Sequence, residues 1–343
     1  MKQRIVYGGL PALQRELAKE EWQNAKYTIL LDENTFQYCL PFLVSQVEAL
    51  QEAEFVEVPV GEECKSLEVA AQVWQTLMES GADRNTVIVN LGGGCVSDLG
   101  GYVASCYKRG LRCINIPTTL LAMVDAAIGG KTAVNFGGVK NSIGTFHEAE
   151  IVCIERQFLD SLPEVEQLSG RFEMVKTAAV TDSELYLRML KADTMTQKMI
   201  GNVARMKHRV VSADPYDNSI RHILNFGHTF GHAVEVYSGL PHGVAVGIGM
   251  KSALYLSMRK VGLREEVYDT YSQWLASRLA TSRLPMPSYQ LKDIEQMLSL
   301  MRHDKKNASG VIRCVLLQEL GVPMIDVEIS DNEIRDTLLH AGN

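Results

Sequence analysis

The chain has 343 residues, of which 46% are hydrophobic and 22% are charged. This balance is typical of a globular protein with a full core and excludes a disordered chain, while the length favours two domains. The formal net charge of −7 argues against a nucleic-acid-binding protein, because a polyanion requires a basic face. Any anionic ligand must therefore be held by local clusters of lysine and arginine.

The amino terminus and the cysteines indicate a compartment. Residues 1–10 lack the apolar stretch of a secretory signal, and no run of about 18 apolar residues could cross a membrane. The seven cysteines are an odd number without a CxxC pair, which predicts reduced core residues instead of disulfides or metal ligands. We therefore expect a cytoplasmic protein with no membrane partner.

The first half alternates short β-like runs with helical stretches. The expected strands are 27–32, 55–60, 86–93, 113–118 and 150–155. This alternation predicts a parallel sheet with crossover helices. We expect an α/β domain over residues 1–155.

Amphipathic patterns take over after about residue 156. The clearest are 182–192, 196–213, 217–238, 244–261 and 292–302. They predict a mostly α-helical domain over residues 156–343.

Residues 90–105 (NLGGGCVSDLGGYVAS) join a predicted strand to a helix through three glycines. Glycines let a ligand approach the backbone, and the free N–H groups of a helix amino terminus favour phosphate. A nucleotide pyrophosphate site and a purely structural turn both fit, because the pattern is not GxGxxG. Upstream, Glu62 and Lys65 start a predicted helix, where a solvated cap with a weak ion pair is the simpler explanation.

Polar residues gather among apolar residues and glycines in the segment 109–141. They are Arg109, Thr118, Thr119, Asp125, Lys131, Lys140 and Asn141. Any one of the lysines could lie on an exposed loop. Together, fixed cations with Thr and Asn donors predict a cradle for phosphate and carboxylate groups.

A polar stripe at helical spacing marks the segment 217–235. Its members are Asp217, Arg221, Asn225, His228, His232 and Glu235. Apolar residues between them predict a buried helix, whose polar stripe must meet a ligand, a metal or another polar face. Glycine costs roughly 1 kcal/mol in a helix interior, so Gly227 and Gly231 indicate close approach on that helix.

The two histidines of this stripe could form a metal clamp, a substrate clamp or a tightly packed helix. A third, His242, follows within a short loop. Catalytic zinc has three protein ligands, which include His nitrogen and carboxylate oxygen. Glu173 is a candidate carboxylate, because the helix around it is otherwise apolar.

In these motifs the chain resembles the 3-dehydroquinate synthases, within the sugar-phosphate cyclases, whose wider fold relatives are the metal-dependent glycerol and alcohol dehydrogenases. The likeness runs in consistent order from about residue 60 to 310. Two motifs, PTTLLAMVDAAIGGKT at 117–132 and NFGHTFGHA at 225–233, are too long and unusual for a chance match. Shorter ones are GE..K (61–65), GGG.VSDLGG (92–101), KN.IG.F (140–146), E..K (173–176), K......D (207–214), HG..V.IGM (242–250) and DKKN (304–307).

The resemblance implies a Rossmann-like NAD-binding domain followed by a helical domain that holds a divalent metal. Zinc is the first expectation for this metal and cobalt the second. By motif position, the metal ligands would be Glu173, His228 and His242. The NAD contacts would be Asp32, Asn34, Glu62, Lys65, Gly93, Gly94, Asp98, Thr118, Thr119, Asp125, Lys140 and Ser161.

The substrate contacts and catalytic residues implied by the resemblance form a second set. They are Asp125, Lys131, Asn141, Lys176, Lys207, Arg221, Asn225, His232 and one of Lys305 or Lys306. Arg109 corresponds to an arginine that the family donates across a homodimer interface.

The family reaction belongs to the shikimate pathway of chorismate and aromatic amino acid biosynthesis. The substrate, 3-deoxy-D-arabino-heptulosonate 7-phosphate, is oxidised by NAD, loses phosphate, is reduced again, opens and closes by an aldol step to 3-dehydroquinate. The alternatives are a sibling cyclase, such as a 2-deoxy-scyllo-inosose synthase or an aminodehydroquinate synthase, and a metal-dependent polyol dehydrogenase. A polyol dehydrogenase has no need for the phosphate-anchoring lysines.

Four positions depart from many relatives. Val244, Pro215 and Asp217 stand where those relatives carry Glu, and Phe172 stands where they carry Ala. None of the four is a predicted ligand. A shorter acid at 217 and an apolar residue at 244 could alter metal affinity through groups around the ligands, and they leave room for a sibling substrate.

Overall fold

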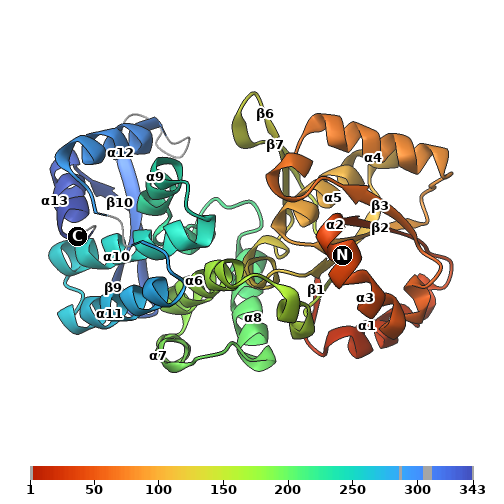
Figure 1. Ribbon diagram of the computed structural model, residues 1–343, viewed down its shortest axis with the longest axis horizontal. Helices are drawn as coiled ribbons and strands as arrows, with labels where there is room; N and C mark the ends of the chain where they lie inside the picture. Colours follow the sequence, from red (N-terminus) through yellow and green to blue (C-terminus); the bar gives the residue numbers. More distant parts are fainter. Residues whose placement is uncertain (1–2, 286–287, 304–310, 342–343) are drawn as a thin grey trace. The chain divides into compact units, whose positions relative to one another are not determined.

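The computed structural model describes residues 3–285, 288–303 and 311–341 and divides into two compact units (Figure 1). The first comprises Met1–Leu162 and Thr196–Tyr216, and the second comprises Pro163–Met195 and Asp217–Asn343. Our expected boundary lay at residue 155, with the later helix in the second domain. That helix belongs to the first unit because its Gln197 amide donates hydrogen bonds to two backbone carbonyls there, at 3.1 and 2.9 Å.

A six-stranded parallel sheet forms the centre of the first unit. In spatial order its strands are β1 (Arg4–Val6), β8 (Ile151–Cys153), β5 (Arg112–Pro117), β4 (Thr86–Gly92), β2 (Lys26–Asp32) and β3 (Glu54–Val58). Strand β4 is buried along its whole length, as in parallel sheets covered on both faces. The predicted parallel α/β domain is confirmed.

The first unit also contains helices and one hairpin. The helices are α1 (Gly9–Leu17), α2 (Glu33–Tyr38), α3 (Leu40–Gln46), α4 (Leu67–Glu79), α5 (Gly94–Cys106) and α8 (Gln197–Ala213). Shorter helical turns are η1 (Glu20–Trp22), η2 (Glu48–Leu50), η3 (Gly61–Cys64), η4 (Tyr107–Arg109), the π-helical η5 (Ala122–Ala126) and η6 (Arg156–Ser161). An antiparallel hairpin of β6 (Lys131–Phe136) and β7 (Val139–Phe146), absent from our expectation, follows η5.

The strand order changes direction between β2 and β4. The chain leaves β2 toward β3 on one side and leaves β4 toward β5 on the other. Ligands of open parallel sheets bind beyond the carboxyl ends of the strands at such a switch point. Asp32 ends β2 and Gly92 ends β4, so the residues that follow them lie where a ligand is expected.

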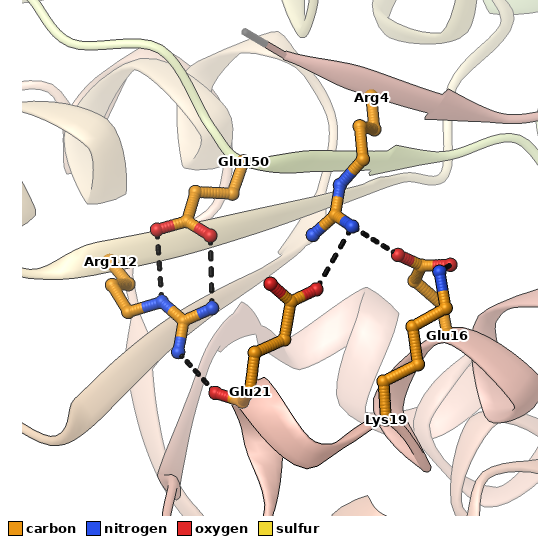
Figure 2. Close-up of polar contacts among 6 residues, drawn as sticks. All are labelled: Arg4, Glu16, Lys19, Glu21, Arg112 and Glu150. Atoms are coloured by element: carbon orange, nitrogen blue, oxygen red, sulfur yellow. Dashed lines mark hydrogen bonds and ion pairs between the residues drawn. The ribbon is translucent and has the colours of Figure 1, made fainter. Parts of the chain in front are cut away.

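The opposite end of the sheet is fixed by arginine pairs (Figure 2). Arg112, the first residue of β5, donates two hydrogen bonds to the Glu150 carboxylate, at 2.9 and 3.0 Å, and lies 3.7 Å from the centre of the Trp22 ring. Arg4 forms an ion pair with Glu16. Bidentate pairing makes the Arg112 contact stronger than an ordinary surface ion pair, which contributes about 0–1 kcal/mol. We assign these contacts to stability, because they lie at the amino ends of the strands.

The second unit is mostly helical, as predicted. Its helices are α6 (Glu164–Thr181), α7 (Ser183–Lys191), the 3₁₀ helix η7 (Ile220–Asn225), α9 (His228–Ser238), α10 (His242–Val261), α11 (Glu265–Thr281), α12 (Leu291–His303) and α13 (Asp331–Ala341). A hairpin of β9 (Ile312–Glu319) and β10 (Val322–Ile329) was not predicted. Within the described ranges, no helix combines the length and apolar character that a membrane span requires.

The predicted single helix over 217–238 is wrong. Helix η7 ends at Asn225 and α9 begins at His228, with Gly227 between them in the left-handed conformation (φ 79°). Gly227 is therefore a turn residue instead of a helix-interior residue, which explains the glycine without a ligand beside it. The polar stripe is split, with Arg221 and Asn225 on η7 and the histidines on α9.

Gly231 marks the crossing of α9 and α10. A Cβ atom at this position would lie 2.9 Å from the Cα atom of Val246, and one at Gly249 would lie 2.1 Å from the carbonyl oxygen of Gly227. The close approach that the sequence predicted at Gly231 is therefore that of the neighbouring helix. Since α9 begins with His228 and α10 with His242, the crossing brings two histidines together.

Candidate metal centre and nucleotide site

Three histidines of the second unit form a cluster on α9 and α10. One ring nitrogen each of His228, His232 and His242 lies within 4.8 Å of the other two. The ring centres are 5.3 to 5.8 Å apart. Neutral imidazole is a common ligand of divalent transition metals, so the cluster is a candidate metal centre.

Glu173 supplies a buried carboxylate to this cluster. It lies on the buried part of α6 and is 1% exposed. Its Oε1 atom is 3.9 Å from Nε2 of His228 and 3.8 Å from Nε2 of His242. Two atoms each about 2.1 Å from a tetrahedral ion are about 3.4 Å apart. The observed separations are thus slightly wider than a shared metal ion requires.

The hydrogen bonds of the two rings direct their Nε2 atoms toward Glu173. Nδ1 of His228 lies 3.3 Å from the carbonyl oxygen of Phe226, and Nδ1 of His242 lies 2.7 Å from Oε2 of Glu235. Both partners are acceptors, so each Nδ1 carries the hydrogen and each neutral ring presents a lone pair at Nε2. Two lone pairs then face a carboxylate oxygen. That arrangement is repulsive without a cation, so these residues fit a divalent metal.

Charged neighbours complete this centre. Nζ of Lys176, one turn along α6, is 2.5 Å from Oε2 of Glu173, and among the described residues neither Glu173 oxygen accepts a conventional hydrogen bond. Burial lowers the pKa of His242, but the hydrogen bond that its Nδ1 donates to Glu235 and the charge of Glu173 outweigh this effect, so its pKa is raised overall. A proton and a metal therefore compete for the same nitrogen.

The geometry leaves two possible ligand sets that share His228 and His242. The third ligand is either Glu173 or His232. We favour Glu173, because it is buried and its Oε1 atom faces the Nε2 atoms of both histidines, while its Oε2 atom pairs with Lys176. His232 then lies beside the centre, within reach of a bound ligand.

Sequence reasoning placed Glu235 in the polar stripe but gave it no role. The structure shows that it bonds to His242, seven residues later, across the turn between α9 and α10. Helical spacing could not reveal this pair, because His242 belongs to another helix. Arg221 of the same stripe is buried on η7, 5% exposed, and Asn225 ends that helix.

In the first unit, Lys65 is the hub of a polar network. Its Nζ donates to Oδ2 of Asp98 on α5 and to Oδ1 of Asn141 on β7, each at 2.6 Å. Asn135 of β6 extends the network, donating from its side chain to Glu62 at 2.9 Å and accepting from the Asn141 backbone at 2.9 Å. Four of these residues were predicted as ligand contacts, but Asn135 was missed. The weak Glu62–Lys65 cap proposed as the simpler alternative is replaced by contacts to the hairpin and α5.

Burial and charge act in opposite directions within this network. Burial raises the pKa of Asp98 to about 6, although the adjacent Lys65 lowers it. Burial lowers the pKa of Lys65, but Asp98 reverses this effect, so the pKa of Lys65 is raised. The pKa of Glu62 is lowered, because hydrogen bonding from Asn135 and the nearby lysines outweigh its burial. All three groups are charged near neutral pH.

The glycine-rich turn joins β4 to α5 as the sequence predicted. Gly93 precedes the helix and Gly94 is its first residue. Cβ atoms there would lie 3.0 Å from the Thr119 side chain and 3.1 Å from the Ala126 side chain. The turn thus needs small residues for packing alone, which supports the structural alternative, while its position at the switch point suits a phosphate.

Asp125 lies on the π-helical turn η5 and pairs with Lys207. Oδ1 of Asp125 is 2.5 Å from Nζ of Lys207, which is 7% exposed on α8. The sequence predicted both residues as functional but did not predict their contact. Single π-helical turns occur often at functional sites.

The remaining predicted NAD and substrate contacts differ in their exposure. Asp32 caps α2 by accepting a hydrogen bond from the Thr35 backbone at 2.9 Å, and Thr118 is buried at the end of β5. Exposed positions are Asn34, Arg109, Lys131, Lys140 and Ser161. Lys305 and Lys306 lie outside the described residues.

The positions that depart from relatives have structural explanations in part. Phe172 is fully buried and packs against Trp274, with ring centres 5.5 Å apart, and Val244 is fully buried in α10. Asp217 has a positive φ of 60°, which aspartate tolerates better than most residues. Its carbonyl oxygen contacts Nε2 of His222 at 3.1 Å.

Solved structures of other proteins show the same fold. The chain is similar to a 2-deoxy-scyllo-inosose synthase solved with carbaglucose-6-phosphate, NAD⁺ and Co²⁺, with TM-score 0.84 and 22% identity over 99% of this chain and 97% of the other. A 2-epi-5-epi-valiolone synthase from Streptomyces hygroscopicus, solved with NAD⁺ and Zn²⁺, gives TM-score 0.82 and 24% identity over 99% and 97%. An iron-containing alcohol dehydrogenase from Thermococcus thioreducens gives TM-score 0.64 and 17% identity, over 100% of this chain and 98% of the other. The chain therefore has the fold that these two synthases share with the alcohol dehydrogenase.

Sequence comparison narrows the class to one family. Residues 55–169 match the family model for the 3-dehydroquinate synthase N-terminal part, and residues 170–307 match that for the C-terminal part. A 3-dehydroquinate synthase from Parabacteroides distasonis is 38% identical over 91% of this chain and 90% of its own length. One from Dehalococcoides mccartyi is 41% identical over 84% and 81%. The chain belongs to the 3-dehydroquinate synthase family.

Proposed function

We propose that the chain converts 3-deoxy-D-arabino-heptulosonate 7-phosphate to 3-dehydroquinate and phosphate. The observation that carries this proposal is that the N- and C-terminal family models match adjoining segments, 55–169 and 170–307. The enzyme would be a phosphate-eliminating carbon–oxygen lyase that uses NAD and a divalent metal. When bound, NAD would accept and return a hydride, and the metal would polarise the oxygen at which the substrate is oxidised.

Glu173, His228 and His242 would hold the metal. Their convergent lone pairs and buried negative charge support this assignment. Zinc and cobalt both accept imidazole and carboxylate ligands, and zinc is our first expectation. His232, at the edge of the cluster, would hydrogen-bond the substrate phosphate and carry protons near neutral pH.

The first unit would bind NAD beside the carboxyl ends of β2 and β4. The backbone at Gly93 and Gly94 would contact the pyrophosphate, because helix N–H groups there point out of α5. The remaining contacts would come from the family positions Asp32, Asn34, Glu62, Lys65, Asp98, Thr118, Thr119, Asp125, Lys140 and Ser161. The switch point between β2 and β4 supports this location.

Cationic and amide groups would bind the anionic substrate and direct its protons. In the second unit these are Lys176, Arg221 and Asn225, of which the first two are buried. In the first unit they are Lys131, Asn141 and Lys207, with Asp125 oriented by its contact with Lys207. Fixed cations hold phosphate and carboxylate without reorganisation, so the chain's share of catalysis would be positioning and electrostatics. One of Lys305 or Lys306 would add a further anchor.

We also propose a cytoplasmic homodimer in which each chain donates Arg109 to its partner. Lys108 and Arg109 both have positive φ, 50° and 69°, and the Arg109 side chain is exposed. A strained backbone that turns a charged side chain outward supports a role beyond this chain.

A sibling cyclase that acts on another sugar phosphate is the second candidate. The neighbour solved with carbaglucose-6-phosphate shares the fold but only 22% identity, so the higher identity to the synthases favours 3-dehydroquinate. A polyol dehydrogenase is disfavoured by the buried cations Lys176, Lys207 and Arg221.

Phosphate release with product identification tests the proposal. The purified chain should release phosphate from the heptulosonate phosphate only with NAD and a divalent metal, and 3-dehydroquinate should form in equal amount. A strong chelator should abolish release, and NADH should not accumulate. Steady accumulation of NADH would indicate a dehydrogenase, whereas faster release from glucose 6-phosphate or sedoheptulose 7-phosphate would indicate a sibling cyclase.

A further inference from the structure

We propose that Glu235 is a positioning residue of the metal centre, which holds His242 in its ligating orientation and supplies negative charge that the metal requires. The inference rests on the proposed function, because it takes Glu173, His228 and His242 as the ligands. The Glu235 carboxylate accepts a hydrogen bond from Nδ1 of His242, at 2.7 Å, on the side of the ring away from Nε2.

The two histidine ligands are held differently. His228 is 13% exposed and begins α9, and its Nδ1 atom lies 3.3 Å from a neutral backbone carbonyl. His242 is 36% exposed, and its Nδ1 atom lies 2.7 Å from a carboxylate. It also follows a turn in which Gly239 is left-handed (φ 69°). The more exposed ligand, directly after a turn, thus has the stronger outer partner.

Charge gives Glu235 a second role. The ligand carboxylate of Glu173 is already paired with Lys176, whose Nζ atom is 2.5 Å away. This pair contributes no net charge to balance a dication. Glu235 is 18% exposed and adds one negative charge through the His242 ring, which strengthens the ring as a donor.

Metal affinity measured on the metal-free full chain tests this role directly. We expect Glu235→Ala to weaken zinc and cobalt binding by about 10–100-fold in chelator competition, as is usual when the outer partner of a ligating histidine is lost. Glu235→Gln should fall between wild type and Glu235→Ala, because its amide oxygen still accepts from Nδ1 but carries no charge. The absorption spectrum of bound Co²⁺ should change in Glu235→Ala, because His242 loses its fixed orientation.

Matched variants separate positioning from folding. Glu184→Ala removes an exposed glutamate on α7 of the same unit and should keep wild-type affinity. Thermal unfolding of each metal-free variant shows whether a loss of affinity merely follows a loss of stability. If Glu235 only braces the turn, metal-free stability falls but both variants bind metal as wild type does, and the inference is overturned.

The outcomes also distinguish this inference from the proposed function. His228→Ala should lose stoichiometric metal. If it does and both Glu235 variants keep wild-type affinity, the centre stands and the role of Glu235 is rejected. If His228→Ala binds metal as tightly as wild type, the proposed ligand set itself fails, and the inference fails with it.

Discussion

The two units arrange their polar residues in opposite ways. In the first, opposite charges meet: Lys65 contacts Asp98 at 2.6 Å, and Lys207 contacts Asp125 at 2.5 Å. In the second, electron-rich atoms meet, with Nε2 atoms of His228 and His242 within 3.9 Å of a Glu173 oxygen. The first arrangement is compensated within the chain. In the second, Lys176 pairs with Oε2 of Glu173, but Oε1 still faces two imidazole lone pairs, which calls for a further cation.

This difference indicates whether each unit depends on a bound ligand for its stability. Oppositely charged partners can form as the chain folds, so the first unit should be preformed for NAD. Histidine and carboxylate ligands must be deprotonated to bind metal, so metal binding should stabilise the second unit and weaken toward low pH. The comparison therefore predicts that metal removal lowers the stability of the second unit more than that of the first.

The largest effects should come from the paired histidines of α9. His228→Ala should lose stoichiometric zinc and all measurable turnover, since it removes a proposed ligand, while NAD binding persists. His232→Ala should keep zinc but lose turnover by about 10²–10⁴-fold, the usual range for a proton-transfer group. Zinc content by mass spectrometry and phosphate release measure the two properties separately.

Loss of zinc from His232→Ala would break this assignment. The ligands would then be His228, His232 and His242, whose nitrogens also lie within 4.8 Å of one another. Glu173→Gln serves as the companion variant: on our assignment it loses zinc, and on the three-histidine assignment it keeps most of it.

Sequence patterns predicted much of this architecture because they record local physics. The buried strand β4, the three glycines after it and the buried acid on α6 all leave a local signature. The fold class followed from the alternation of strand-like and helical runs, and the family and its reaction followed from long motifs. The individual site residues stay predictions, because neither spacing nor burial identifies a bound ligand.

The missed features depend on tertiary contacts or on backbone conformation. The helical spacing of polar residues continues through Gly227 in the sequence. It could not show that Gly227 adopts a left-handed conformation and separates two helices. The hairpin β9–β10 was missed because its second strand contains Pro323 and an irregular register between Met324 and Val327. Helix α8 was predicted, but its periodicity could not show that it packs in the first unit.

A smaller effect should follow from Gly231→Ala, which tests whether the helix crossing builds the metal centre. Its Cβ atom would lie 2.9 Å from the Val246 backbone, so α9 and α10 must move apart. We expect a loss of about 1–3 kcal/mol in unfolding free energy, typical of overpacking, together with weaker zinc binding. Denaturant unfolding and chelator competition measure these changes.

Gly201→Ala is the matched control in the first unit. Its Cβ atom would lie 3.2 Å from the Tyr7 ring, a side chain that can shift, and alanine favours a helix by about 1 kcal/mol over glycine. It should leave zinc affinity unchanged. Equal zinc affinity in both variants would mean that the crossing does not determine the ligand positions.

The smallest effect concerns the charge pair of the first unit and appears as a pH dependence. The pKa of Asp98 is raised from 3.8 to about 6 in the folded chain, chiefly by burial. Between these values the folded state binds more protons than the unfolded state, so this group's contribution to stability falls as pH rises from about 4 to 6, by at most about 3 kcal/mol.

Asp98→Asn should remove this dependence of stability on pH. It also leaves Lys65 without its carboxylate partner, but Lys65 is protonated throughout this range and adds only a constant offset. Urea unfolding of the wild type and the variant at several pH values measures this dependence. The wild type should lose stability relative to the variant as pH rises from about 4 to 6. The opposite slope would mean that Lys65 lowers the pKa of Asp98 more than burial raises it, and the pair would then be a stronger internal compensation than we infer.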